Sequence, residues 1–172
     1  MKNDNAEEML YYPCDILIPA AVEFMINDDN HKKIAASMIV EIAGNSLTFA
    51  AQKKLYERGV PIIPDLLSNS GSGMLSYIEW LKGKSHNNTN IVKILSGIKN
   101  IDSSLYSEVS KNMPIGEKEA VIMGLGFWVS RIADDVLNYS QIENVSLKTA
   151  AYCLAIQRIN EYIDKMKQEK TL

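Results

Sequence analysis

The stretch Gly59-Val60-Pro61-Ile62-Ile63-Pro64-Asp65 is a short apolar run that opens with a glycine. Thr48 is a suitable N-cap for a helix over residues 49–58. Gly59 then stands just past the predicted helix end, where a residue that tolerates positive φ is favoured. The sequence therefore predicts a helix followed directly by a strand.

Two similar runs precede it. In Asp15-Ile16-Leu17-Ile18-Pro19 consecutive residues are apolar, which predicts a strand buried on both faces. Met38-Ile39-Val40-Glu41 predicts another such strand. Between them, Asn27 or Asp28 can cap a short polar helix that runs through Lys33. Strands and helices alternating at this spacing predict two βαβ crossovers, and hence a parallel sheet with right-handed connections.

From Tyr77 onward the pattern is helical almost throughout. We expect helices over 74–81, 89–98 and 103–113, with a loop at 83–89 that separates an α/β domain at 1–82 from a helical region at 83–172. A longer helix over 118–138 is predicted from Val121, Leu125, Trp128, Val129, Ile132 and Val136. Ser146 is predicted to cap a helix over 147–167, with a buried stripe of Ala150, Cys153, Leu154, Ile156 and Ile159.

The composition excludes several classes of function. Lys and Arg number 18 against 21 Asp and Glu, and the net charge of −3 without a basic stripe argues against nucleic acid as a partner. The longest apolar runs, 16–22 and 121–129, are shorter than the roughly 18 residues that a membrane span needs. Cys14 and Cys153 lie far apart and no secretion signal opens the chain, so we expect a cytoplasmic protein with two free thiols.

Residues 64–73 form the most informative candidate site. They are rich in Ser, Asn and Gly and lie between a predicted parallel strand and a helix, where open α/β sheets hold ligands. Small residues there let the backbone approach a cofactor, although an ordinary polar turn has the same composition. Gly124-Leu125-Gly126 lacks the third glycine of a dinucleotide fingerprint, because Val129 stands in its place, and a packed helix is expected. His31 and His86 are predicted to be surface residues.

Several segments together resemble the glutamate/leucine/phenylalanine/valine dehydrogenase family. The early segments match the second half of its nucleotide-binding domain in order and spacing, and the stretch from Thr149 to Ile159 resembles its C-terminal helix. The resemblance covers residues 7–82 and about 127–163. The matching residues are Cys14-Asp15-Ile16-Leu17-Ile18-Pro19-Ala20-Ala21, Ile39-Val40-Glu41, Glu57-Arg58-Gly59-Val60, Ile63-Pro64-Asp65, Asn69, Gly71, Ser76-Tyr77, Glu79-Trp80 and the stretch from Thr149 to Ile159.

The resemblance implies half of a Rossmann-type sheet, its fourth to sixth strands, followed by the helical region, with NAD or NADP as the cofactor. Ala20 and Ala21 match the family's turn beside the cofactor, and Asn69 matches the asparagine at the nicotinamide end. Ser76 matches a serine that, in glutamate-specific members, helps to hold the substrate's side-chain carboxylate. The implied reaction is the oxidative deamination of an L-amino acid, with glutamate favoured.

Departures from the family limit this expectation. Its Glu-Gly-Ala-Asn-Gly-Pro stands here as Glu41-Ile42-Ala43-Gly44-Asn45-Ser46. Its catalytic lysine and aspartate, and its glycine fingerprint, belong to parts that precede residue 1, so this chain alone is expected to show no turnover. Two hypotheses follow: the C-terminal part of a glutamate-type dehydrogenase, or a catalytically dead relative that serves as a structural or regulatory interaction subunit.

The resemblance also implies an open sheet. Without the family's first strand, the strand at 15–18 has an unpaired edge, and parallel sheets are stable when covered. We expect this edge to be closed by another copy of the chain, by a companion dehydrogenase subunit, or by the helices of residues 84–120.

Overall fold

The computed structural model describes residues 6–84 and 117–169. These residues form two compact units, one of 6–68 together with 135–169 and the other of 69–84 together with 117–134. The predicted helices at 89–98 and 103–113, most of the predicted loop at 83–89 and His86 lie outside the described residues. The domain boundary expected after residue 82 stays a prediction.

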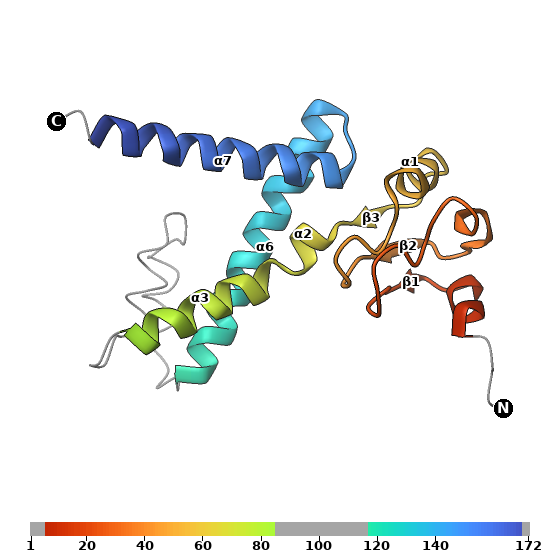
Figure 1. Cartoon of the computed structure of the whole chain (residues 1–172), viewed down its shortest axis with the longest axis horizontal. Coiled ribbons are helices and arrows are strands. Elements are labelled where there is room, and N and C mark those ends of the chain that lie inside the picture. Colours follow the sequence, from red (N-terminus) through yellow and green to blue (C-terminus); the bar gives the residue numbers. More distant parts are fainter. Residues whose placement is uncertain (1–5, 85–116, 170–172) are drawn as a thin grey trace. The chain divides into compact units, whose positions relative to one another are not determined.

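A three-stranded parallel sheet lies in the first unit (Figure 1). Its strands are β1 (Ile16–Leu17), β2 (Met38–Val40) and β3 (Ile62–Ile63), in the order β1-β2-β3. Ile39 on the central strand is in register with Leu17 on one side and Ile62 on the other. The predicted parallel α/β arrangement is therefore confirmed.

Helix α1 (Phe49–Glu57) covers the sheet's core as the sequence predicts. The backbone N–H of Ala51 donates to Thr48 Oγ1 at 3.2 Å, which caps the helix start. Gly59 has a φ of +77°, as expected just past the helix end. Ala51 and Leu55 share one helix face and join a core of Leu10, Ile26, Ile34, Ala36, Ile39, Leu47 and Ile62.

The segment before β2 is less helical than predicted. Only a 3-10 turn, η2 (His31–Lys33), forms, because the Asn30 side chain stabilises a turn: its Oδ1 accepts from Asn27 N and its Nδ2 donates to Met25 O, both at 2.8 Å. His31 is only 4% exposed, so its expected surface position is wrong. The guanidinium of Arg58 donates to the His31 carbonyl at 2.9 Å and holds this turn against the end of α1. A further 3-10 helix, η1 (Ala6–Tyr11), opens the described chain.

Most of residues 64–73 are helical, with a turn only at Asn69, which corrects the predicted polar turn. Helix α2 (Asp65–Ser68) directly follows β3, and α3 (Ser70–Lys84) begins at the glycine-rich stretch. A Cβ added at Gly71 would lie 3.4 Å from Val129 Cγ2 of α6 (Glu117–Glu143), so the missing side chain permits close helix packing in the second unit. This tertiary contact outweighs the low helix propensity of Gly and Ser. The predicted helical state of the Gly124–Gly126 segment is confirmed.

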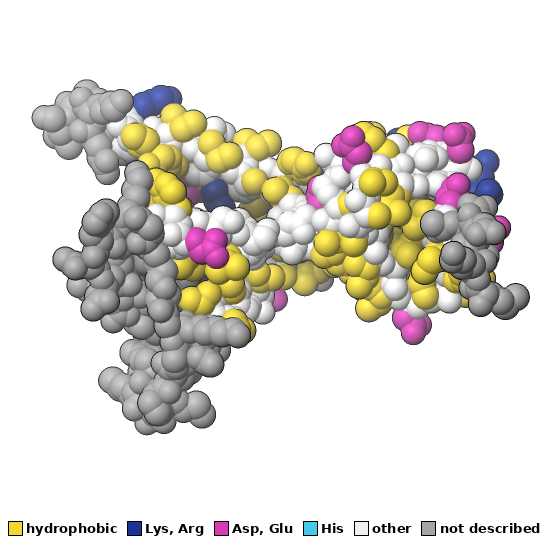
Figure 2. Space-filling view, turned by 60° about the horizontal axis from the view of Figure 1, so that its bottom comes forward, with side chains coloured by type: hydrophobic (Ala, Val, Ile, Leu, Met, Phe, Trp, Pro, Cys, Tyr) yellow, Lys and Arg dark blue, Asp and Glu magenta, His cyan; other side chains and the backbone are white. Residues whose placement is uncertain are grey.

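Helix α7 (Leu147–Glu169) begins at the predicted cap, where Ser146 Oγ accepts from Thr149 N at 3.2 Å. Near its start it contacts β3 and α2 and buries Ala150 and Ala151. The predicted buried stripe is wrong further along, because Ile156 and Ile159 are more than half exposed. We call a row of exposed apolar side chains at helical spacing the outer face of α7 (Figure 2). Its residues are Tyr152, Ile156, Ile159, Ile163 and Met166.

No helix of the described residues combines the length and apolar character that crossing a bilayer requires.

A buried carboxylate connects α7 to the sheet. The Glu41 side chain is fully buried at the end of β2. Its Oε1 accepts from Ser46 Oγ and from Leu47 N, both at 3.2 Å, and its Oε2 lies 3.4 Å from Lys148 Nζ. A buried charge is tolerated only when it is paired and hydrogen-bonded, so these contacts explain how Glu41 is accommodated.

We expect Ile39→Ala to lower the free energy of unfolding by about 2–5 kcal/mol, because it opens a cavity beneath α1. Ile16→Ala removes the same atoms from a side chain that is 53% exposed and should cost clearly less. Urea denaturation of both variants checks this. Equal losses would show that the sheet core is not centred on β2.

We expect Lys148→Met to destabilise the fold by about 3–5 kcal/mol, because it leaves the buried Glu41 carboxylate without a counter-charge. Adding Glu41→Gln removes that charge, so the double variant should recover much of the loss. A double-mutant cycle in urea measures the coupling. Additive effects of the two substitutions would rule out an energetically significant pair.

Candidate functional site

The candidate site is the edge of the sheet at which all three parallel strands end. The carbonyl of Pro19, just beyond β1, accepts from Ile42 N at 3.1 Å and from Ala43 N at 3.0 Å. Asp65 Oδ2, just beyond β3, accepts from Asn45 N at 2.8 Å. The loop after β2 is therefore hydrogen-bonded to the chain on either side of it, and the three strand ends form one connected surface.

The loop after β2 also pairs with the segment after β1. Phe24 N donates to Asn45 O at 2.9 Å, and Ile26 N donates to Ser46 O at 3.1 Å. Asn45 has a φ of +49°, in the left-handed region that glycine occupies freely and asparagine tolerates better than most residues. It stands where the resembled family pattern has glycine. The exchange of Gly and Asn in this loop thus keeps a residue suited to the required backbone conformation.

Ala20 and Ala21 lie in the first unit, directly after Pro19, and both are exposed. Their small side chains leave the backbone of this turn accessible at the carboxyl edge of the sheet. This is the edge at which open α/β folds bind ligands. Whether either residue contacts a cofactor stays a prediction.

Asn69 and Ser76 lie in the second unit. Asn69 directly precedes α3 and is half-buried, and its carbonyl accepts from Ser72 Oγ at 2.8 Å and from Ser72 N at 3.1 Å. Ser76 is exposed on α3, about two helical turns further on. A separation of about two turns places Asn69 and Ser76 on the same side of α3. Two residues that contact the same ligand need such an arrangement.

The charged side chains at this edge are acidic. The loops at 18–25, 41–48 and 64–68 contain no lysine or arginine. Glu41 is paired with Lys148 and Asp65 is hydrogen-bonded to the backbone, while Glu23 is exposed in the loop after β1. The edge therefore offers no cation to an anionic ligand group, and whether it holds a cofactor stays a prediction. The described residues also contain no cluster of side chains suited to a metal ion.

The sequence alone does not indicate that Lys148 pairs with Glu41. It lies 107 residues from Glu41 and stands among ordinary surface-type residues at the start of a helix. Glu41 itself gives a weak indication of this pair, because an acidic residue directly after an apolar strand needs a counter-charge or hydrogen bonds if it is buried. Only the folded chain brings the two together.

Comparisons with known proteins agree with this geometry. The sequence model described as Glutamate/Leucine/Phenylalanine/Valine dehydrogenase matches residues 1–167. The NADP-specific glutamate dehydrogenase of Saccharolobus shibatae is 49% identical over 79 residues, which are 46% of this chain and 19% of that protein. The NAD-specific glutamate dehydrogenase of Staphylococcus aureus is 30% identical over 155 residues, 90% of this chain and 31% of that protein.

Solved structures show the same fold. The hetero-hexameric glutamate dehydrogenase of Thermus thermophilus aligns with a TM-score of 0.65 at 23% identity, over 90% of this chain and 31% of that one. The chain thus spans about a third of the length of the relatives that it matches. Since the family match extends over nearly all of its residues, this chain belongs to the glutamate/leucine/phenylalanine/valine dehydrogenase family.

Proposed function

We propose that this chain supplies the nicotinamide side of the cofactor domain in an NAD(P)-dependent amino-acid dehydrogenase that acts on glutamate. The observation that supports this most is the exposed turn at Ala20 and Ala21. It lies at the carboxyl edge of the parallel sheet, beside a hydrogen-bonded loop without cationic side chains. The nicotinamide ring, when bound, accepts a hydride from the substrate. The backbone of this turn would position that ring. Asn69, which lies in the second unit, is a separate candidate for contact with the ring, on the family resemblance alone.

Catalysis requires proton-transfer and substrate-positioning side chains that the described residues at the carboxyl edge of the sheet do not provide. Positioning and proton transfer by side chains each contribute large factors to such reactions. A polypeptide equivalent to the unmatched part of the relatives would supply the pyrophosphate site, the lysine and the aspartate. The chain alone is then inactive, and it acts on an amino acid only within a complete enzyme.

Ser76 supports glutamate as the substrate. Its hydroxyl lies on the exposed side of α3, where it can donate to a carboxylate. An apolar residue at this position would favour a branched-chain substrate, because it offers no donor and would contact the alkyl group instead. Ser76 is therefore proposed as a specificity residue rather than a catalytic one.

A partner polypeptide is the second part of the proposal. The outer edge of β1 has no strand partner among the described residues. Ile16, in β1, and Ile18, just after it, are 53% and 56% exposed. The outer face of α7 is also uncovered. Exposed apolar strands and patches of this kind are typical of interfaces. A second copy or a companion dehydrogenase subunit in the cytoplasm would cover them.

A structural or regulatory subunit is the alternative function. The Thermus thermophilus structure is hetero-hexameric, so assembly from unlike chains occurs within the family. Ile42, which replaces the first glycine of the family loop, is 41% exposed at the candidate cofactor edge. A branched side chain there hinders close approach of a cofactor and favours this alternative.

We expect the chain to quench or shift NADH fluorescence at millimolar concentrations, with weak affinity because it provides one end of the site. Ala20→Glu should weaken binding roughly tenfold, since it adds bulk and negative charge beside an anionic cofactor. Ala35→Glu is the control, because Ala35 is also exposed but precedes β2 at the opposite edge of the sheet. No binding by the unaltered chain, or equal weakening by both variants, would favour the structural subunit.

We expect the purified chain to associate, with itself or with a companion subunit, through β1. Ile18→Lys should reduce self-association in sedimentation velocity, because a charge on an exposed strand opposes pairing. Ile142→Lys alters a side chain that is 79% exposed on α6 and should have no such effect. A monomeric chain that withstands mild heating would argue against an interface at β1.

A further inference from the structure

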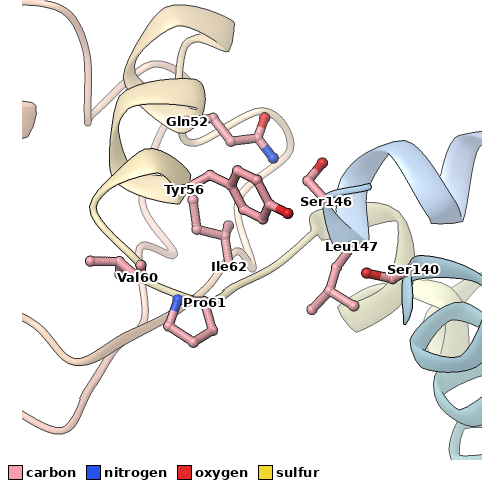
Figure 3. A pocket seen from close by; sticks show the side chains of 9 residues that line it. Gln52, Tyr56, Val60, Pro61, Ile62, Ser140, Ser146 and Leu147 are labelled. Atoms are coloured by element: carbon pink, nitrogen blue, oxygen red, sulfur yellow. The ribbon is translucent and has the colours of Figure 1, made fainter. Parts of the chain in front are cut away.

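A pocket of about 190 Å³ lies beside β3, between α1 and the start of α7 (Figure 3). Gln52 and Tyr56 line it from α1, and Val60 and Ile62 line it from the start of β3. Leu147, the first residue of α7, closes the other side. All of these residues belong to the first unit, so the pocket is a feature of that unit alone.

Gln52 is the unusual residue of this pocket. Its side chain is only 7% exposed, and its amide has no hydrogen-bond partner among the described residues. Figure 3 shows the amide directed from α1 toward the start of α7. The amide atoms of Gln52 keep contact with solvent, because among the described residues only His31 Nδ1 is a buried side-chain polar atom without a hydrogen bond. The pocket therefore offers two N–H donors and one carbonyl acceptor that the protein leaves to water or to a ligand.

The other hydroxyls at the pocket are mostly engaged. Ser140 Oγ donates to Val145 O at 2.6 Å, and Ser146 Oγ accepts from Thr149 N at 3.2 Å. Both bonds hold the turn between α6 and α7 in place. The Tyr56 hydroxyl, which Figure 3 shows directed toward the start of α7, and the amide of Gln52 are thus the polar side-chain groups available to a ligand.

The walls indicate what kind of molecule fits. The lining contains no lysine, arginine, aspartate or glutamate, and most of its surface is aliphatic or aromatic. An ion would lose hydration there without gaining a counter-charge, so a neutral ligand is favoured. Cavities of about 150 Å³ accommodate a molecule of the size of benzene, which sets the scale for this pocket.

We propose that this pocket binds a small neutral molecule with an apolar body and one amide group. An amide pairs with Gln52 reciprocally, since each of the two groups both donates and accepts a hydrogen bond. The apolar body would contact Val60, Ile62 and Leu147. Binding would link α1 and β3 to the start of α7, and it is independent of the proposed cofactor site.

The test compares isobutyramide with isobutyrate, which has the same shape but a negative charge. Each is titrated into the ¹⁵N-labelled chain while the side-chain amide signals of Gln52 are followed by NMR. We expect isobutyramide to shift these signals with a saturable, millimolar dissociation constant, and isobutyrate to bind at least tenfold more weakly. Equal binding of the two, or no saturable shift with isobutyramide, would overturn the proposal.

Two further measurements locate the site. Gln52→Met keeps the length of the side chain without its amide and should weaken isobutyramide binding about tenfold, whereas Gln141→Met, at an exposed position of α6, should not. In the unaltered chain, nuclear Overhauser contacts should join the methyl groups of isobutyramide to Val60 and Leu147, which needs no variant to fold. Contacts elsewhere, or unchanged binding by Gln52→Met, would mean an adventitious additive only.

Discussion

The buried carboxylate of Glu41 is the constraint on which the rest of the first unit depends. It stands at the end of the central strand, fixes the loop after β2 through Ser46 and Leu47, and pairs with Lys148 at the start of α7. A single ionised group thus determines both the shape of the candidate cofactor edge and the attachment of the last helix. Any change that moves α7 must also disturb the charge balance beneath that edge.

The candidate edge and the pocket have different chemistry. At the carboxyl edge the carbonyl of Pro19 accepts from Ile42 and Ala43, and Asp65 accepts from Asn45, so the loop after β2 is hydrogen-bonded on both sides. The pocket beside β3 has the amide of Gln52, which makes no hydrogen bond within the described residues. The edge is where open α/β folds bind ligands, whereas the pocket depends on how α1 and α7 pack in this chain.

Local signals in the sequence were sufficient for the sheet, for α1 with Thr48 and Gly59, and for the start of α7 at Ser146, because each depends on neighbouring residues. These local signals failed where contacts between residues far apart in the chain determine the structure. Gly71 lies in a helix where Val129 packs against it, and Arg58 binds the backbone carbonyl of the buried His31. The pairing of Glu41 with Lys148 joins residues too far apart in the chain for any periodicity to reveal. The sequence predicts a candidate site at the strand ends, and that location stays a prediction. The interactions that shape this edge, such as the pair of Glu41 and Lys148, depend on residues far apart in the chain.

The outer face of α7 has a consequence for the life of the protein in a cell. A row of exposed isoleucines is the kind of surface that chaperones and proteases recognise on incompletely assembled chains. A chain whose partner occludes that row escapes such surveillance, whereas surplus copies are removed. In the assembly proposed above, the abundance of this polypeptide would follow the supply of its companion subunit, because the exposed apolar row would mark surplus copies for removal.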